Sequence, residues 1–263
     1  MRHRAAPGLV RSSLADVIDL VLRRECAGCG RTGTSWCSDC WSSLLGVPQV
    51  RRLDGPEARA SLSVWSAGEY RDEVRSAVVA WKDRGRTDLT PVLARALRRS
   101  VLQAWGAAER PRSAAAGSGP VLLVPAPSSA RSRRQRGHEP VRDLALRCAA
   151  ALRRQGVEVR VVPVLAQARQ LQDQVGLGVA GRSANLAGAL CARQGWTRHV
   201  LGRDCIVVDD VVTTGATLLE CRRALTDVGA RVHGAATVAA TPRRAPHGGD
   251  QRFTRTALQT GDG

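Results

Sequence analysis

The chain has 263 residues, which is enough for one sizeable domain with a small module or for two compact domains. It is 43% hydrophobic but only 3% aromatic, so its core must consist mostly of Ala, Val and Leu, and its formal net charge is +17. Its single lysine, Lys82, follows Trp81, so the chain lacks a Gly-Lys-Ser/Thr motif and is not a P-loop ATPase.

The first predicted element is a helix over residues 9–24. Arg11, Asp16 and Asp19 interrupt its apolar residues, so it matches neither a signal peptide nor a membrane span. We therefore expect a cytoplasmic protein without membrane insertion, in which thiols stay reduced and the eight cysteines are not paired as disulfides.

Two C-x-x-C pairs follow this helix, formed by Cys26, Cys29, Cys37 and Cys40. Four thiolates at this spacing can bind one tetrahedral Zn²⁺ ion, and such closed sites are structural rather than catalytic. The gap of seven residues between the pairs is shorter than in most zinc ribbons, so a redox pair or spare thiols are the alternatives. We predict structural zinc, covered by Trp36 and Trp41. The remaining cysteines are predicted to be small buried residues: Cys148, Cys191, Cys205 and Cys221.

The middle of the chain is predicted to contain a short strand over 62–66 and helices over 70–82 and 89–102. Residues 106–120 are rich in Ala, Ser, Gly and Pro, so we expect a flexible loop or linker there.

Strands and helices alternate from residue 121 to residue 239. The predicted strands are 121–127, 157–165, 205–208 and 232–239, and the predicted helices are 140–154, 180–192 and 215–228. This alternation is typical of an α/β fold with a parallel sheet and right-handed crossovers. A polar, glycine-rich tail over 241–263 is predicted to be disordered.

The segment between the strand 205–208 and the following helix carries polar residues at the place where open α/β sheets bind ligands. We expect residues 209–214 to form a turn. The helix start at Gly215 and the hydroxyls of three threonines favour a phosphate, whereas Asp209 and Asp210 favour a vicinal diol or hydrated Mg²⁺. Together they describe a site for a ribose 5-phosphate. The alternative is an ordinary strand end with a threonine cap and two solvated aspartates.

The run "VVDDVVTTGAT" closely resembles the phosphoribosyl pyrophosphate (PRPP) motif of type I phosphoribosyltransferases. In that family the two acids contact the ribose hydroxyls and the T-T-G-x-T loop holds the 5-phosphate. The resemblance implies an open, mostly parallel sheet with helices on both faces, and PRPP bound together with Mg²⁺. It assigns PRPP binding to Asp209, Asp210, Val211, Val212, Thr213, Thr214, Gly215, Ala216 and Thr217.

A cysteine module ahead of such a domain resembles the ComF family, including the GntX-like proteins. This implies a zinc-binding module over 1–55 and a phosphoribosyltransferase-like domain over 56–240. Three further segments agree with the family pattern. The agreement lies at Tyr70 and Lys82, at Pro125, Pro127, Arg136 and Gly137, and at Gln174, Leu177, Arg182 and Asn185. The chain departs from the pattern at His138 and Glu139, where the family usually has Phe-Asn, and at Leu190, which replaces Phe.

The resemblance also suggests roles for residues outside the acidic turn. A pyrophosphate and substrate loop would comprise Pro125, Ala126, Pro127, Ser128, Arg136 and Gly137, with Lys82 nearby. This basic loop could instead be exposed to solvent without a ligand, or its arginines could contact DNA phosphates. Lys82 could instead cap the C-terminus of its helix. Candidates on the substrate side are Gln174, Arg182, Asn185, His138 and Glu139. Arg182 and Asn185 could equally brace the sheet.

The sequence thus predicts a PRPP-binding protein that exchanges pyrophosphate at C1 of the ribose for a nucleophile, with structural Zn²⁺ and with Mg²⁺. No general base is evident, and the acceptor, the presence of catalysis and the oligomeric state stay open. The alternative is a non-catalytic single-stranded DNA-binding protein of natural transformation, working beside a competence helicase, as ComF proteins are thought to do. The net charge of +17 suits that reading, although an arginine-rich proteome would produce it without any partner.

Overall fold

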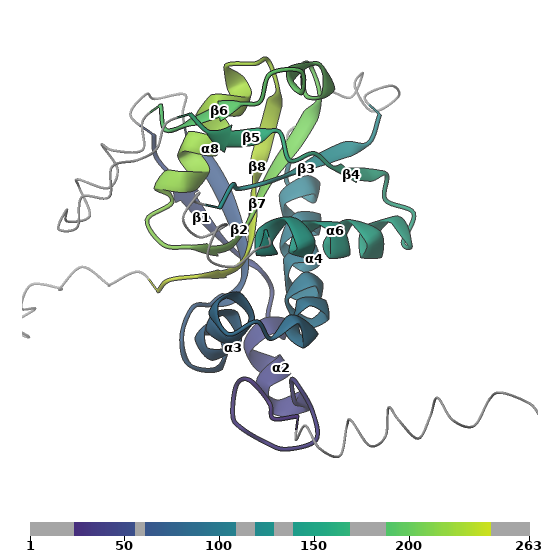
Figure 1. The fold of residues 1–263 in the computed structure, drawn as a ribbon, viewed down its shortest axis with the longest axis vertical. Helices are drawn as coiled ribbons and strands as arrows, with labels where there is room; N and C mark the ends of the chain where they lie inside the picture. The colour runs from purple at the N-terminus through teal and green to yellow at the C-terminus, as the bar shows by residue number, and fades with distance from the viewer. Residues whose placement is uncertain (1–23, 56–60, 109–118, 129–138, 169–187, 243–263) are drawn as a thin grey trace, which may run out of the picture.

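The computed structural model describes residues 24–55, 61–108, 119–128, 139–168 and 188–242. Its centre is a six-stranded sheet in the order β1-β2-β8-β7-β3-β4, in which only the pair β1–β2 is antiparallel (Figure 1). The strands are β1 (Gln49–Leu53), β2 (Leu62–Glu69), β3 (Val121–Pro125), β4 (Val159–Val161), β7 (Asp204–Val212) and β8 (Arg231–Ala240). The mostly parallel sheet confirms the predicted α/β class.

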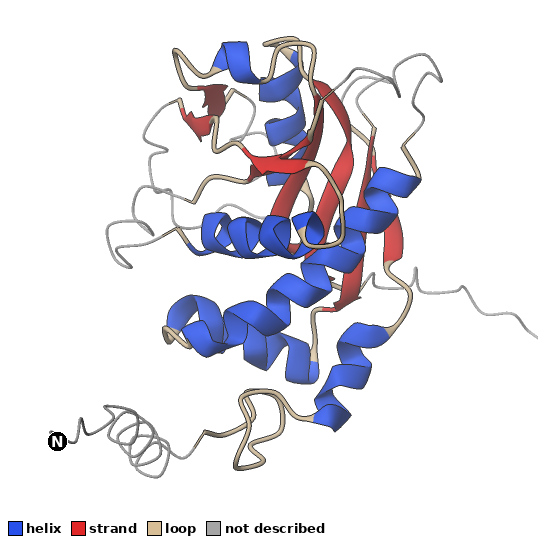
Figure 2. Ribbon diagram, turned by 90° about the vertical axis from the view of Figure 1, so that its right-hand side faces the viewer, coloured by secondary structure: helices blue, strands red, loops and turns tan. Residues whose placement is uncertain are grey.

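Helices cover this sheet on both faces (Figure 2). One face packs against α3 (Asp72–Asp83), α4 (Thr90–Gly106) and α6 (Pro140–Arg153). The opposite face packs against α8 (Ala216–Thr226) and a small antiparallel sheet of β5 (Leu165–Gln167) and β6 (Leu190–Ala192). The other described elements are α2 (Ser38–Leu45) and the 3₁₀ turns Thr87–Leu89 and Thr197–His199. None of these helices is both long and apolar enough to cross a membrane.

The two apolar layers follow from the alternation of side chains along the central strands. In β3, Leu123 joins the core under α4 and α6, whereas Leu122 and Val124 join the core under α8. All five residues of β3 are buried, as a parallel strand covered on both faces requires. The largest fully buried side chains are eleven leucines and Ile206, which agrees with a core poor in aromatic residues.

One predicted strand is divided in the structure. Residues 157–165 are expected to be continuous, but β4 ends at Val161 and β5 begins at Leu165. Pro163 lies between them and has no N–H to donate to a sheet. The chain therefore leaves the main sheet here, and β5 pairs with β6 instead.

The predicted helix over 180–192 is wrong at its C-terminal end, because β6 occupies Leu190–Ala192. The Leu190 amide donates a 3.0 Å hydrogen bond to the Glu220 carboxylate, and the Leu190 carbonyl accepts one of 2.8 Å from Arg223. Both partners lie on α8, so a tertiary contact holds the segment extended. The rest of this predicted helix, residues 180–187, lies outside the described residues.

The other predicted helices and strands between residues 62 and 239 are present, with shifted ends. Sequence reasoning does not predict α2 or β1. The predicted division of the chain at residue 55 stays a prediction; β1, on its N-terminal side, pairs with β2 as an edge strand of the main sheet. Most of the helix 9–24, of the loop 106–120 and of the tail 241–263 lies outside the described residues.

A buried carboxylate at the start of β7 gives the fold a pH-dependent contribution. Burial opposes ionisation of Asp204, but hydrogen bonds of 2.8 Å from Arg231 and His233 outweigh it and lower its pKa to about 2. Because the folded-state pKa is below the ordinary value of 3.8, this stability is present above about pH 4 and is lost as the pH falls toward 2.

Replacing Asp204 by asparagine is therefore expected to lower the free energy of unfolding at pH 7 by about 1–2 kcal/mol, the half-exposed Arg231 limiting the effect. Urea denaturation at pH 7 and pH 3 measures this, and the difference from the wild type should shrink at pH 3. The control is Asp39→Asn, which removes an exposed ion pair with Arg31 and should cost less than about 0.5 kcal/mol. An equal loss of unfolding free energy in Asp204→Asn and Asp39→Asn would contradict the stabilising role of Asp204.

Candidate functional site

The acidic pair lies at the C-terminal end of β7, beside the loop that follows β3. The predicted turn over 209–214 is wrong in its first part, because β7 continues to Val212 in register with β8 and only residues 213–215 turn. The Ala126 amide donates a 2.9 Å hydrogen bond to the Val208 carbonyl, which holds the loop after β3 beside the acids. The carboxyl ends of two parallel strands thus place two predicted motifs together.

The turn between β7 and α8 is held from its carbonyl side. Arg51 of β1 donates to the carbonyls of Thr213 and Thr241. The Thr241 amide donates in turn to the Val212 carbonyl at 3.0 Å. Gly215 adopts φ = 85°, which suits glycine, and α8 begins at the next residue. The amide groups of the first turn of α8 face this end of the sheet, where they favour an anion.

These elements enclose an open pocket of about 400 Å³, within the range of ligand-binding clefts. The side chains come from α3 and the turn before it, the loop after β3, the start of α6, the end of β7, the turn after it and the start of α8. The lining residues are Tyr70, Val78, Lys82, Ala126, Pro127, Ser128, Val141, Asp209, Asp210, Val211, Thr213 and Thr217. The pocket thus has an acidic wall beside a threonine-rich wall.

Lys82 forms an ion pair with the acidic wall. Its ammonium lies 2.5 Å from a carboxylate oxygen of Asp210, whose side chain is only 4% exposed. Asp209 is partly exposed to the pocket, and its carboxylate accepts a hydrogen bond from the Asp210 amide at 2.8 Å. Burial and the neighbouring charge of Asp210 raise the pKa of Asp209 well above its usual value, although Lys82 opposes the shift. Among the described residues, the lining of the site therefore holds two acids close together and the ammonium of Lys82.

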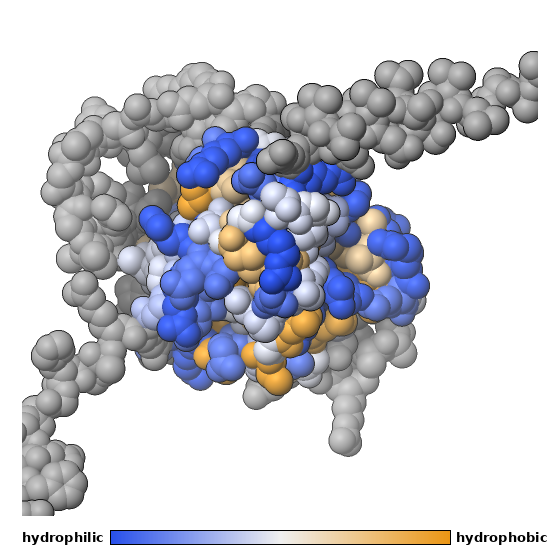
Figure 3. All heavy atoms as spheres, turned by 90° about the horizontal axis from the view of Figure 1, so that it is seen from below, coloured by the Kyte–Doolittle hydropathy of each residue, from blue (hydrophilic) through white to orange (hydrophobic). Residues whose placement is uncertain are grey.

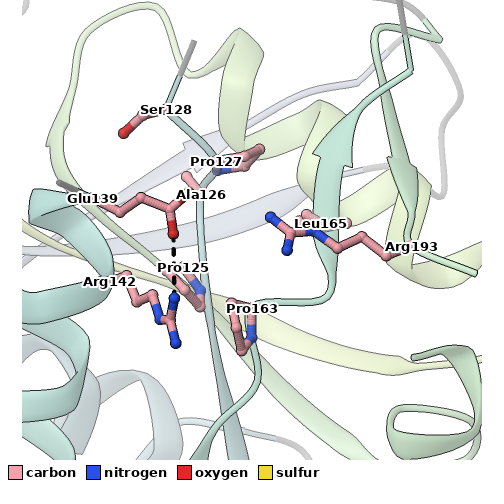
Figure 4. A pocket seen from close by; sticks show the side chains of 9 residues that line it. All are labelled: Pro125, Ala126, Pro127, Ser128, Glu139, Arg142, Pro163, Leu165 and Arg193. Carbon is pink, nitrogen blue, oxygen red and sulfur yellow. Dashed lines mark ion pairs between the residues drawn. The ribbon is translucent and has the colours of Figure 1, made fainter. Parts of the chain in front are cut away.

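A narrower pocket also borders the loop after β3 (Figure 4). Arg142 of α6 is 3.7 Å from Glu139, and Arg193, just after β6, points toward the loop at Pro127. The remaining lining residues are Pro125, Ala126, Ser128, Pro163 and Leu165. Both pockets share the loop Ala126–Ser128, so Arg142 and Arg193 line a pocket beside the same loop that borders the acidic wall.

The structure brings together most of the predicted site residues that it describes. Asp209, Asp210, Val211, Thr213 and Thr217 line the larger pocket. Val212 points into the core under α8. In the turn, the Thr214 hydroxyl accepts a 3.3 Å hydrogen bond from the Ala216 amide, and Gly215 supplies the left-handed backbone. Glu139 lies at the narrower pocket only. Arg136, Gly137, His138, Gln174, Arg182 and Asn185 lie outside the described residues.

Sequence reasoning misses the residues that reach the site from distant segments. Arg51 braces the turn, Val78 and Val141 line the larger pocket, and Arg193 lines the narrower one. The resemblance points to Tyr70 as a matching position, but not to its place in the pocket wall. None of these residues stands in a local motif with a chemical meaning of its own, so no sequence signal marks them.

The four cysteines of the N-terminal module form a compact cluster. Their sulfur atoms all lie within 4.8 Å of one another, with 3.7 Å between Cys26 and Cys40 and 3.6 Å between Cys29 and Cys37. Sulfurs about 2.3 Å from a tetrahedral zinc ion are separated by about 3.8 Å, so the cluster fits zinc. Burial disfavours a thiolate at Cys26, but backbone amides including that of Cys37 lower its pKa to about 6.

Serine at Cys37 is expected to remove the metal, because three thiolates and a hydroxyl bind zinc far more weakly than four thiolates. Atomic emission spectroscopy on purified protein should find about one zinc per wild-type chain and almost none in the variant. Cys191→Ser is the control and should keep its zinc, because Cys191 lies far along the chain in β6 and outside the cluster. Undiminished zinc in Cys37→Ser would reject the site.

The other cysteines divide into two kinds. Cys148, Cys205 and Cys221 are buried, as predicted, and burial raises the pKa of Cys148 and of Cys205 to about 12. Their thiols stay neutral and serve as small apolar side chains. The prediction for Cys191 is wrong, because this residue is exposed in β6.

Comparison with known proteins identifies a domain in the part of the chain that contains β7. Residues 147–252 match the family described as the phosphoribosyl transferase domain. The matched stretch contains β7, the acidic pair, the turn and α8, but it leaves out the cysteine cluster and Lys82. A search of the curated proteins found no match to the chain. The C-terminal half of this chain therefore contains a phosphoribosyltransferase domain, and the matched stretch includes the acidic and threonine walls of the larger pocket.

Proposed function

We propose that the larger pocket binds PRPP. The main support is that one pocket of about 400 Å³ has an acidic wall and a second wall rich in hydrogen-bond donors. Asp209 and Asp210 form one wall, and Thr213, Thr217 and the start of α8 form the other. A phosphorylated sugar needs acceptors for its hydroxyls at one end and N–H or O–H donors for its phosphate at the other.

In this orientation the ribose hydroxyls donate to the two aspartates and the 5-phosphate lies at the turn 213–215. The pyrophosphate then extends toward the loop Ala126–Ser128, which also borders the narrower pocket lined by Arg142 and Arg193. Mg²⁺ bound with PRPP would neutralise part of the pyrophosphate charge. The ion pair between Lys82 and Asp210 offsets one of the two negative charges in the acidic wall.

We further propose that the chain transfers the phosphoribosyl group to an acceptor and releases pyrophosphate. The bond from C1 to the pyrophosphate oxygen breaks as the acceptor approaches C1, and the electron pair leaves with pyrophosphate. The oxocarbenium-like transition state is stabilised by position and charge, with the carboxylates of Asp209 and Asp210 near the developing positive charge. The cysteine cluster ahead of the domain supports a place among ComF proteins.

Titration calorimetry with PRPP and Mg²⁺ tests the binding proposal directly. We expect saturable binding that inorganic pyrophosphate and ribose 5-phosphate each weaken by competition. Incubation with PRPP, Mg²⁺ and a panel of nucleobases, amines and single-stranded DNA, with detection of released pyrophosphate, tests the transfer. Binding without acceptor-dependent release would leave a PRPP-binding protein and reject the enzyme.

The net charge of +17 favours a second candidate function, binding of single-stranded DNA beside a competence helicase. In that case arginine contacts to phosphates carry the affinity, and the pocket serves as a sensor. Binding of single-stranded DNA, measured by fluorescence anisotropy, should then weaken steeply between 50 and 200 mM salt, by about 300-fold or more if six or more phosphates are contacted. Affinity that does not change with salt would exclude this candidate.

A further inference from the structure

The cysteine module, residues 24–45, is packed directly against α3. Gly28 approaches α3 so closely that a Cβ atom at this position would lie 2.8 Å from Cβ of Glu73. The same Cβ atom would lie 2.7 Å from Sγ of Cys40 within the module. Ser43 of α2 donates a hydrogen bond of 3.4 Å to the Glu73 carboxylate. Figure 1 shows the module at one end of the molecule, with α3 between it and the sheet.

The far end of α3 is also attached to the module. Arg86, just after the helix, donates a 3.1 Å hydrogen bond to the Glu25 carbonyl and is oriented by Asp88, which accepts two further bonds of 2.8 and 2.9 Å. These contacts join the first cysteine pair to the segment that ends α3. The module therefore contacts the first turn of α3 and the segment just after its last turn.

The module and α3 share one apolar core. Three of the cysteines and Trp36 are 3–5% exposed and belong to the same core as Val74, Ala77 and Trp81. Seen from below, the described surface mixes hydrophilic and hydrophobic residues (Figure 3). The shared core shows that the cysteines that would bind zinc form part of the support under α3.

The residue after Trp81 is Lys82, whose ammonium lies 2.5 Å from Asp210 in the larger pocket. Lys82 is the only lysine of the chain. Asp210 is almost fully buried and has Asp209 as its neighbour, so losing this cation would leave two close carboxylates with less compensation. The position of α3 therefore determines the charge balance at the pocket.

We propose that the cysteine module positions Lys82 for its ion pair with Asp210, so that metal binding in the module controls the charge of the pocket. Zinc fixes the fold of residues 24–45, this fold holds α3 through Gly28 and Arg86, and α3 holds Lys82. Lys82 acts as a positioning residue for the acidic wall. The effect on PRPP rests on the proposed function, whereas the effect on Lys82 itself does not.

The single lysine makes this testable without any ligand. Competitive labelling with acetic anhydride, followed by mass spectrometry, measures the reactivity of the Lys82 amine against that of the N-terminus in the same molecule. An ion pair favours the charged, unreactive form of an amine, so breaking it should raise Lys82 labelling by about tenfold. We expect this increase after zinc is removed by a chelator, and also in zinc-loaded Arg86→Ala and Gly28→Ala.

Arg84→Ala is the matched control for Arg86→Ala, because Arg84 is exposed and lies two residues away. It should leave Lys82 reactivity and PRPP affinity unchanged. Circular dichroism shows whether each protein is folded, and the zinc-loaded variants decide the question if the metal-free protein unfolds. Lys82 reactivity that stays unchanged in folded Arg86→Ala and folded Gly28→Ala would overturn the proposal.

PRPP titration of the same proteins separates this proposal from the proposed function. If Lys82 reactivity rises but no protein binds PRPP, the positioning role stands and the proposed function fails. If the wild type binds PRPP and neither Lys82 reactivity nor PRPP affinity changes in the variants, the positioning role fails alone. We expect both to change together, with PRPP affinity falling by about tenfold, the effect of one partly exposed charge pair.

Discussion

Replacing Asp209 and Asp210 together by asparagine is expected to weaken PRPP binding by at least about 100-fold, because each ionised acceptor of a ribose hydroxyl contributes about 1.5–3 kcal/mol. An asparagine amide accepts only through its neutral oxygen and offers donors where the ligand also has donors. Titration calorimetry in the presence of Mg²⁺ measures the loss. Asp143→Asn is the control, because Asp143 is exposed in the first turn of α6 and should leave the affinity unchanged. Unaltered binding in the double variant would reject the site.

The single variant Asp209→Asn should become more stable while it loses affinity. Burial and Asp210 raise the pKa of Asp209, so the folded state disfavours its charged form and stability decreases as the pH rises through that raised pKa. Asparagine removes this cost and keeps an oxygen that can accept from the Asp210 amide. Denaturant titration at pH 8 should show a higher midpoint than the wild type. A lower midpoint would mean that Asp209 supports the fold instead.

The raised pKa of Asp209 also predicts how PRPP affinity depends on pH. The proposed site needs an ionised Asp209, so affinity should increase with pH through its raised pKa and then level off. Calorimetry from pH 5 to pH 9 in buffers of different ionisation enthalpy would also report proton release on binding. An affinity that decreases over this interval would place the ligand away from Asp209.

The second large effect is expected at Gly215. Alanine there must adopt φ = 85°, and its Cβ would lie 2.2 Å from a methyl carbon of Leu53, so both the backbone and the β1 side chain oppose it. We expect the free energy of unfolding to fall by about 2 kcal/mol and PRPP affinity to fall by more than about tenfold, because the phosphate turn is displaced. Thermal denaturation and calorimetry measure the two effects.

Gly202→Ala is the matched control for this substitution. Gly202 has φ = 64°, but a Cβ there meets nothing within 4 Å, and the residue does not line the larger pocket. We expect Gly202→Ala to lower the free energy of unfolding by about 1 kcal/mol, from backbone strain alone, and to leave PRPP affinity unchanged. If Gly202→Ala and Gly215→Ala weaken PRPP binding equally, the turn 213–215 is not the phosphate site.

The sequence alone was sufficient where the structure depends on neighbouring residues. The cysteine cluster, the strands β3 and β7 and the helix after Gly215 can all be predicted from local patterns in the sequence. The adjacency of Asp209 and Asp210 to the threonines is also local, so the pattern indicates the chemistry of the larger pocket before any fold is known. The family match over residues 147–252 identifies the domain in which this segment lies, whereas the roles of its residues stay a prediction.

Tertiary structure decided what distant segments do to one another. Lys82 meets Asp210 across 128 positions of sequence only because α3 and β7 end at the same edge of the sheet. The extended conformation of β6 depends on Glu220 and Arg223 of α8, which outweigh the helical pattern around residue 190. Such contacts form between side chains whose separation in the sequence has no period, so spacing carries no sign of them. Local order follows from backbone preferences, whereas charge pairing at the pocket follows from how the folded layers meet.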